Sequence, residues 1–373
     1  MEKELNDHSL KTILLVAGWA LMLTLFFVSV GYWATSITYQ AKMRSIKKHE
    51  ERMDPDMSEK GRTKAEVKGE PGLNKADPAT VETGVYIDRI VEISTKATSW
   101  TVDFYIWFKW TDPAIQPGNN FQVVDGEILS KTKKETYQGQ KIYYELYRVV
   151  ARMTKFFDIS RFPRDDHLLT IRIEDSARQI HQLIYIADKN ASKKSSRVEI
   201  PGYHIYMAEV IVKPHSYKTN RGDPRLPKNY KATYSQLIYG IGIARPDWGL
   251  YVKMFQGLFS AVMISLLAFF VLPIDTPRFA LGIGAFFAAV AATYITKSQL
   301  PGVGIITLTD MISGIGLTTV FLTLLSSIIA LYLYDKKKQM KLARIMDKLA
   351  FIIILVGYVT VNITIALAAS YKY

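Results

Sequence analysis

The chain of 373 residues contains no cysteine, and this absence excludes several kinds of chemistry. It leaves no disulfide framework, no metal site built on thiolates and no cysteine nucleophile. Common catalytic motifs are also lacking: the sequence has no glycine-rich phosphate loop, no nucleophile elbow and no His-Glu metal motif. The adjacent carboxylates Asp165–Asp166 and Glu174–Asp175 point to opposite faces of a strand, so neither pair makes an acid–base couple. We therefore expect neither an enzyme nor a cofactor.

Charge is lacking from five long stretches of the chain. Crossing a bilayer takes about 17–25 mostly apolar residues, and each stretch is long enough to do so. The stretches are Thr12–Tyr39, Met254–Ile274, Phe279–Thr296, Met311–Tyr334 and Leu349–Tyr371. The sequence therefore predicts a multi-pass membrane protein with one large polar domain between the first two spans.

The net charge of +13 fits membrane topology better than nucleic-acid binding. The short basic segment Asp335–Lys348 joins the last two spans, and the positive-inside rule puts such a loop in the cytoplasm. Counting back through the spans places the polar domain outside the inner (cell) membrane, extracellular or periplasmic, and the N-terminus inside. The basic segment Lys42–Arg52 argues against this orientation, because it would lie outside. Either the later spans determine the orientation, or the first span is a signal sequence. The first apolar run exceeds the usual signal core of about 7–15 residues, which favours a retained anchor.

Composition divides the chain into four parts. Residues 1–41 form a tail and membrane anchor, and residues 42–80 a charged, flexible linker with few large apolar residues. Residues 81–247 hold short alternating runs typical of strands, and residues 248–373 hold the last four spans. Strands are expected at Gly84–Ser94, Ser99–Trp110, 141–156, 167–175, Gly202–Lys213 and Tyr234–Arg245. The predicted fold is an antiparallel β-sandwich, a four-helix transmembrane bundle and one additional N-terminal transmembrane helix.

A charged, proline-bearing turn interrupts the strand pattern after residue 155. Its Phe156, Asp158, Ile159, Phe162, Pro163 and Asp165 resemble the signature loop of pentameric ligand-gated ion channels, the Cys-loop receptor superfamily. Lys155 and Leu169 stand where animal receptors have the two bridging cysteines, and a cysteine-free loop resembles the bacterial members. Other marks follow in order: Trp110, Asp112 and Pro113; Arg245; Pro273; and the turn Gln299–Pro301. The resemblance covers about residues 82–373 and implies a homopentamer in a lipid bilayer, with no nucleic-acid partner.

The resemblance implies that the third span lines a central pore. Its expected lining face steps by three or four residues, as one face of a helix must. The residues of that face are Ala280, Gly284, Phe287, Ala291, Tyr294 and Ser298. Phe287, near the middle, is expected to form an apolar ring that gates by dewetting. Small and aromatic residues also suit helix–helix packing, so that interpretation stays open.

The inner mouth of this pore departs from the family pattern. Asp275, Thr276 and Arg278 occupy it, but no glutamate stands beside the arginine as it does in cation channels of the family. Pro277, together with Lys297 near the outer mouth, resembles anion-selective members. The sequence leaves the choice between cations and anions open.

Residues at the junction of domain and membrane are expected to couple the two parts. They are Phe162, Pro163, Asp165, Arg245 and Pro301. Pro163 suits a turn rather than a central strand because it fixes φ and lacks an N–H. Phe162 is expected to project toward the membrane interface, and Asp165 to pair with Arg245. The alternative is an ordinary exposed turn with solvated charges.

Ligands of the family bind between neighbouring subunits in the outer domain. The resemblance places Tyr105, Trp107, Ser176, Tyr217 and Tyr230 at such a site, where aromatic side chains would enclose a small-molecule or ion ligand. Ser176 stands where the family has its central tryptophan, so a cage for a quaternary amine is incomplete. Alternatively, the tyrosines are half-buried strand residues. No metal site is expected.

The leading interpretation is a ligand-gated ion channel with an extra N-terminal anchor. The second is a non-conducting membrane sensor or scaffold on the same fold, because Ala280, Gly284 and Phe287 give the pore face little polarity. The third is a monomeric β-sandwich adhesin, against which four closely spaced C-terminal spans argue, since one span would anchor it.

Overall fold

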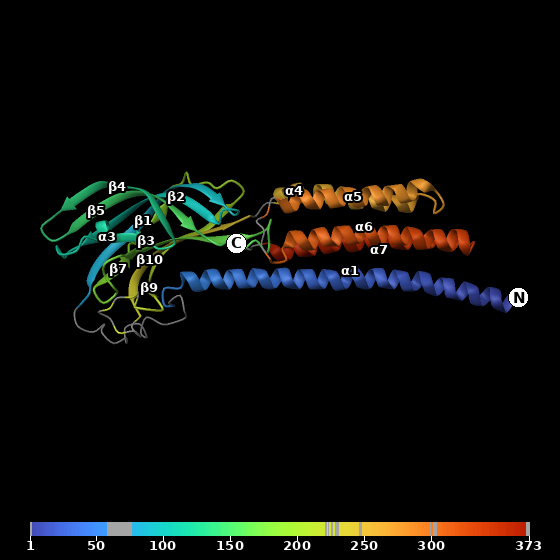
Figure 1. Cartoon of the computed structure of the whole chain (residues 1–373), viewed down its shortest axis with the longest axis horizontal. Helices are drawn as coiled ribbons and strands as arrows, with labels where there is room; N and C mark the ends of the chain where they lie inside the picture. The colour runs from blue at the N-terminus through green and yellow to red at the C-terminus, as the bar shows by residue number, and fades with distance from the viewer. Residues whose placement is uncertain are drawn as a thin grey trace. The chain divides into compact units, whose positions relative to one another are not determined.

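The computed structural model describes residues 2–57, 77–220, 222, 224, 227, 231–245, 248–298, 300 and 304–370. The chain falls into two compact units, a helical one and a sheet-rich one (Figure 1). The helical unit comprises Met1–Met43, Ile159–Asp165 and Pro246–Lys372, and the sheet-rich unit comprises Arg44–Asp158 and Asp166–Arg245. The segment Ile159–Asp165 thus belongs to the helical unit by its contacts, although the residues on both sides of it do not.

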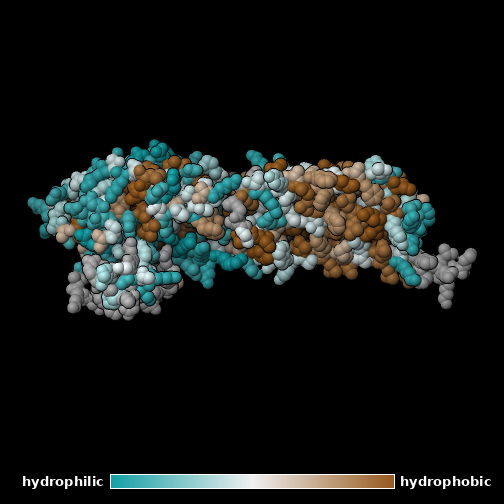
Figure 2. All heavy atoms as spheres, in the orientation of Figure 1, coloured by the Kyte–Doolittle hydropathy of each residue, from teal (hydrophilic) through white to brown (hydrophobic). Residues whose placement is uncertain are grey.

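Within the described part of the chain, five helices are long and apolar enough to cross a membrane, as the sequence predicts. The first, α1, spans Glu2–Met53; α4 spans Trp248–Leu266 and ends in a 3-10 turn, η1, at Leu267–Phe270. The others are α5 (Thr276–Ser298), α6 (Leu308–Leu331) with a π-helical turn η2 (Tyr332–Lys336), and α7 (Met340–Ala369). Hydrophobic residues cover most of the visible face of the helices, whereas hydrophilic residues predominate on the visible face of the sheets (Figure 2). These features fit a membrane-embedded protein.

Glycines let α1 and α7 approach each other closely. A Cβ atom at Gly357 of α7 would lie 2.5 Å from the Phe27 ring of α1, and one at Gly31 would lie 2.9 Å from Val361. Small residues at such contacts are the usual device for close helix packing in a membrane. The extra N-terminal helix therefore packs on the helical unit by one side, where its Leu23, Phe27 and Ala34 are buried.

The N-terminal helix is longer than the sequence predicts. We expect a flexible linker from residue 42, but α1 continues without a break to Met53. Its last turns are rich in lysine, arginine and glutamate, which favour helix. Within the sheet-rich unit, the Lys213 ammonium donates to the Arg52 carbonyl at 2.7 Å, and His49 Nδ1 lies 3.2 Å from the Asp166 carboxylate. These contacts order the first part of the expected linker, and β1 begins at Ala79.

Two sheets make up the sheet-rich unit. The larger has the order β4-β5-β2-β1-β7, with β8 also paired to β1, and the smaller has the order β3-β6-β10-β9. The strands are β1 Ala79–Ser94, β2 Ser99–Trp110, β3 Phe121–Val123, β4 Gly126–Gln138, β5 Tyr143–Thr154, β6 Asp166–Asp175, β7 Leu183–Ala187, β8 Lys193–Lys194, β9 His204–Ser216 and β10 Thr233–Ala244. A one-turn helix, α3 (Pro117–Asn120), precedes β3.

The larger sheet is mixed, which corrects the expectation of purely antiparallel strands. β1 pairs antiparallel with β2 but parallel with β7 and β8. Parallel pairing needs a long connection rather than a hairpin. The connection between β1 and β7 is long, because the chain contributes β6 to the smaller sheet before it forms β7 in the larger one.

Every residue of β10 is buried, because both faces of this strand are covered. Leu237 and Ile241 are fully buried on one face. On the other face, a Cβ atom at Gly240 would lie 2.5 Å from Met53 at the end of α1, and one at Gly242 would lie 2.5 Å from the Tyr206 ring. Successive residues of a strand point to opposite faces, so this one strand supports a core on one side and the end of α1 on the other.

Candidate functional site

The loop Ile159–Asp165 joins β5 to β6 and binds the start of α6. The Leu308 amide donates to the Ser160 carbonyl at 2.8 Å. The Thr309 side chain is fully buried and donates its hydroxyl to the Phe162 carbonyl at 3.0 Å. The first amides of a helix have no partner within the helix, and here the loop satisfies one of them.

Two buried arginines of the same loop reach the end of α7. Arg161 Nη1 donates to the Ala369 carbonyl at 3.0 Å, and Arg164 Nη2 donates to the Ser370 hydroxyl at 2.6 Å. The Arg164 guanidinium also lies 4.6 Å from the ring centroid of Trp248, the first residue of α4. Cations are favoured at a helix C-terminus, where free carbonyls carry partial negative charge. The loop therefore contacts three of the membrane helices.

The start of α6 is in turn tied to the end of α5. Thr307 and Asp310 form a capping box, in which each side chain accepts a hydrogen bond of 3.1 Å from the other's amide. Asp310 also lies 3.0 Å from the Lys297 ammonium in the last turn of α5. A continuous set of contacts thus runs from the loop through α6 to α5. Because Lys297 is balanced by Asp310, its charge is weaker evidence for anion selectivity than the sequence suggests.

The predicted coupling residues have different outcomes. Pro163 lies in a turn, as expected, and Phe162 is only 8% exposed within the helical unit, so its projection toward a membrane interface stays a prediction. Its carbonyl bonds to Thr309, and this holds the residue against the helices. The Arg245 guanidinium lies 4.3 Å from the Tyr203 ring centroid and donates to its hydroxyl. The pairing of Asp165 with Arg245 would join the two units and stays a prediction.

The face of α5 that we expect to line a pore is exposed in the protomer. All six predicted lining residues are exposed, and Phe287 and Tyr294 reach 68% and 75%. The opposite face is buried against α4 and α6, and its residues are Gly282, Ala285, Ala289 and Thr296. In the protomer, the residues predicted to line a pore therefore lie on the face of α5 that no other described helix covers. A lumen at the open face stays a prediction.

Arg278, predicted at the inner mouth, turns its side chain into the helical unit, and an inner mouth beside it stays a prediction. Its guanidinium is fully buried and donates to both carboxylate oxygens of Asp347 in α7, at 2.9 and 2.6 Å. It also donates to the Val271 carbonyl at 2.9 Å. Asp275 and Thr276 are exposed. The arginine therefore serves helix packing, because a buried charge is stable only when paired.

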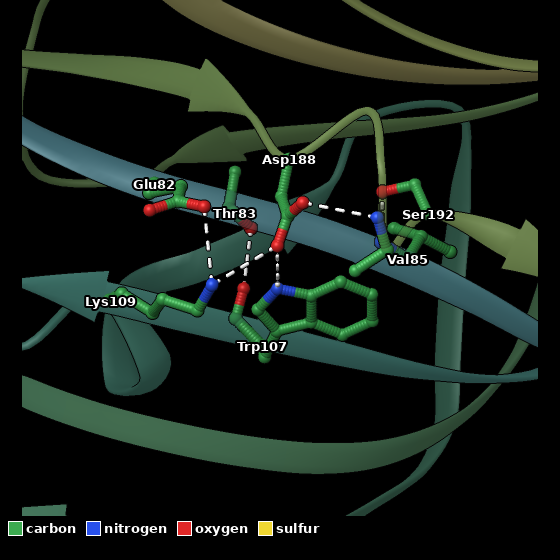
Figure 3. Close-up of polar contacts among 8 residues, drawn as sticks. Glu82, Thr83, Val85, Trp107, Lys109, Asp188 and Ser192 are labelled. Carbon is green, nitrogen blue, oxygen red and sulfur yellow. Dashed lines mark hydrogen bonds and ion pairs between the residues drawn. The ribbon is translucent and has the colours of Figure 1, made fainter.

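Trp107, predicted to contact a ligand, is buried in a polar network around Asp188 (Figure 3). The Trp107 indole and the Lys109 ammonium both donate to one Asp188 oxygen, at 3.2 and 3.1 Å. The other oxygen accepts from the Ala191 amide at 3.1 Å. Burial alone raises the pKa of Asp188. The hydrogen bonds from the Ala191 amide and the Lys109 ammonium together lower it by more, so the pKa lies below its ordinary value. This network fixes the turn after β7 against β1 and β2, and it leaves the indole N–H engaged.

Tyr105, the other residue predicted from β2, is half-buried beneath an arginine. The Arg148 guanidinium lies 5.7 Å from the Tyr105 ring centroid. It also donates two hydrogen bonds to Asp103, at 3.0 and 2.7 Å. The hydrogen bond from Arg148 is the main cause that lowers the pKa of Asp103 below its usual value. A cation of the chain itself therefore already lies near this aromatic ring, and a ligand at Tyr105 stays a prediction.

Tyr217 belongs to a second buried network, centred on Glu174. This carboxylate is fully buried and accepts from the Tyr217 hydroxyl at 3.0 Å, from Gln236 at 2.8 Å and from His215. The His215 and Tyr217 rings lie 4.6 Å apart. No pattern along the sequence pointed to Glu174, because its partners come from β9, β10 and the residues after β9.

The remaining predicted ligand residues stay apart from these networks. Ser176 is exposed and donates its amide to the Asn120 carbonyl at 2.9 Å. Tyr230, like Pro301 of the coupling set, lies outside the described residues. Tyr105 and Trp107 lie on the larger sheet and Tyr217 follows the smaller one, so a ligand site made by neighbouring protomers stays a prediction. Within the described part of the chain, no three acidic or histidine side chains gather as a metal site would require.

Comparison of the chain with protein-family models and with curated proteins yields no match.

Proposed function

We propose that this chain is the protomer of a pentameric ligand-gated ion channel in a cell membrane. In this proposal the two sheets are the outer, ligand-binding sandwich, α4 to α7 are the channel bundle, and α1 is an additional membrane helix. The observation that carries it is the loop Ile159–Asp165, which leaves the strands and binds the ends of α4, α6 and α7. The sequence motif that resembles the coupling loop of such channels thus makes contacts suited to that role.

The proposed mechanism is a shift between closed and open arrangements. A ligand that binds the open arrangement more tightly would favour it, and the strands that flank the loop would move it. The loop is bonded to the start of α6, and Asp310 of α6 is paired with Lys297 of α5. Movement of the loop would therefore be carried to the helix whose exposed face is proposed to line the pore.

Ion flux through the purified full-length protein in liposomes tests the proposal. Phe287 is the large apolar residue at the middle of the exposed α5 face, and a ring of such residues closes a pore by excluding water. With K⁺ and Cl⁻ gradients applied, we expect Phe287→Ala to increase flux several-fold over the unmodified chain. The reversal potential then identifies the permeant ion.

Phe286→Ala is the matched control, because it removes the same side chain from the neighbouring, less exposed position. It is expected to leave flux near the unmodified level. Silence of all three proteins, in liposomes where each is folded and pentameric, would contradict the channel.

A non-conducting sensor on the same fold is the second candidate. The charged residues of α5 are Arg278 and Lys297, and both are paired within the protomer. The described exposed face of α5 therefore offers apolar surface rather than a ring of unpaired charge. A pore that stays dry in every state would favour this candidate, and the flux experiment separates the two.

A further inference from the structure

A groove between α1 and α7 runs along the membrane-spanning part of the helical unit. Its volume is about 810 Å³. One face of α1 lines it from Thr24 to Tyr39, and α7 lines it from Ile352 to Ala368. The channel proposal gives this groove no role, and the helix α1 that forms one wall has no counterpart in most channels of the resembling family.

The walls of the groove suit hydrocarbon. Val28 and Val356, which line it, are 64% and 57% exposed. Two of the hydroxyls among its lining residues are satisfied within the helices: Thr24 donates to the Ala20 carbonyl at 2.9 Å, and Thr364 donates to the Val361 carbonyl at 3.0 Å. Lipid-facing polar groups must be satisfied internally, and these are. An apolar occupant therefore leaves neither hydroxyl without a partner.

The length of the groove matches the acyl chains of one leaflet. From Thr24 to Tyr39 the groove follows α1 for roughly 22 Å, at 1.5 Å per residue. The groove is longer than half of the ~30 Å hydrocarbon core, so it matches the reach of acyl chains from one leaflet.

A basic segment adjoins one end of the groove. Lys42 follows Tyr39 by about one turn, and its ammonium lies 5.9 Å from the Tyr39 ring centroid. The sequence from Lys42 to Lys48 contains basic residues and no acidic one. A lysine ammonium pairs with a phosphate through charge-assisted hydrogen bonds.

We infer that the groove binds the acyl chains of an anionic glycerophospholipid, with the lipid phosphate at the Lys42 end. The helices α1 and α7 touch at Gly31 and Gly357, and the groove lies beside these contacts. The lipid would fill that groove. It would make the extra helix a lipid-dependent part of the helical unit.

Photolabelling of the full-length protein in phosphatidylcholine nanodiscs tests this inference. The probe is a small fraction of phosphatidylglycerol with a diazirine in one acyl chain, and the labelled peptides are mapped by mass spectrometry. We expect label to concentrate on residues 24–39 and 352–368. Thr360→Trp, which fills the groove, should reduce that label several-fold, whereas Val359→Trp, one residue away and outside the groove, should not. Elution volume and unfolding midpoint verify that both variants fold.

Uniform labelling of all membrane helices, or label that Thr360→Trp leaves unchanged, would overturn the groove as a lipid site. Label that avoids both segments while the α1 and α7 peptides of two copies cross-link would assign it to a second copy instead. The headgroup is tested with the same photoreactive chain on phosphatidylcholine, which should label less. Lys42→Gln should remove the difference in labelling between the two lipids. Lys11→Gln, at the other end of the span, should keep this difference. Equal labelling by both lipids in the unmodified protein would overturn the preference for an anionic headgroup.

Discussion

At the scale of single residues, Lys155 carries the clearest link between burial and pH. It follows β5 and lies within the sheet-rich unit, where burial, followed by the nearby positive charges of Arg52 and Lys48, lowers its pKa to about 7. In the unfolded chain its pKa is near the ordinary 10.5. Between these two values the unfolded chain binds a proton that the folded chain has lost, so stability rises with pH across that window. Each unit of pKa difference is worth about 1.4 kcal/mol.

We therefore expect the unfolding midpoint of the full-length protein in detergent to rise from pH 7 to pH 9. Lys155→Met removes the titrating amine, so it should raise the midpoint at pH 7 and flatten this rise. Lys134→Met, at an exposed position, should keep the rise of the unmodified protein. A parallel rise in all three proteins would assign the pH dependence to other groups.

Arg278 illustrates at the same scale why a charged residue is hard to place from sequence. Its neighbours Thr276 and Pro277 suggest the mouth of a pore, yet the side chain turns inward to Asp347. The partner lies in a basic segment that we interpreted as a loop, and that segment is largely the first turns of α7. Contacts between residues so far apart in the chain leave no local pattern, which also applies to Asp188 and Glu174.

At the scale of elements, the spans and most strands could be predicted because their patterns are local. Long runs without charge predict the five apolar helices, and alternation predicts β2 with the bounds that the structure has. The strand β4 was missed because it lies at a sheet edge with nearly every residue exposed, so it has no buried face to reveal. The parallel pairing of β1 with β7 depends on topology, which alternation does not encode.

The packing of α1 on α7 gives a prediction at this scale, and the cysteine-free chain makes it simple to test. The Thr35 and Thr364 hydroxyl oxygens lie 3.4 Å apart, so the sulfur atoms of cysteines at these two positions can approach each other. We expect Thr35→Cys combined with Thr364→Cys to form an intramolecular disulfide, seen as faster migration on non-reducing gels at unchanged mass. Adding Gly357→Leu should lower the yield, because the new side chain overlaps the Phe27 ring.

The control for this cross-link is Trp33→Cys combined with Thr364→Cys, because Trp33 is an exposed residue of α1 that does not line the groove. It should form little intramolecular disulfide. Equal yields from both cysteine pairs would mean that α1 rotates freely against α7, and a disulfide-linked dimer would mean that α1 packs on another protomer.

At the scale of the whole molecule, the exposed face of α5 has to be covered or solvated. Phe287 and Tyr294 are among the more exposed aromatic residues of the membrane helices, and α5 already uses its opposite face to pack on α4 and α6. Five copies arranged with these faces toward a common axis would remove them from lipid. We therefore expect native mass spectrometry of the detergent-solubilised protein to give five times the protomer mass. If the folded protein is instead a monomer, only lipid can contact the exposed face of α5. That result would contradict a central pore, whatever the role of the loop Ile159–Asp165.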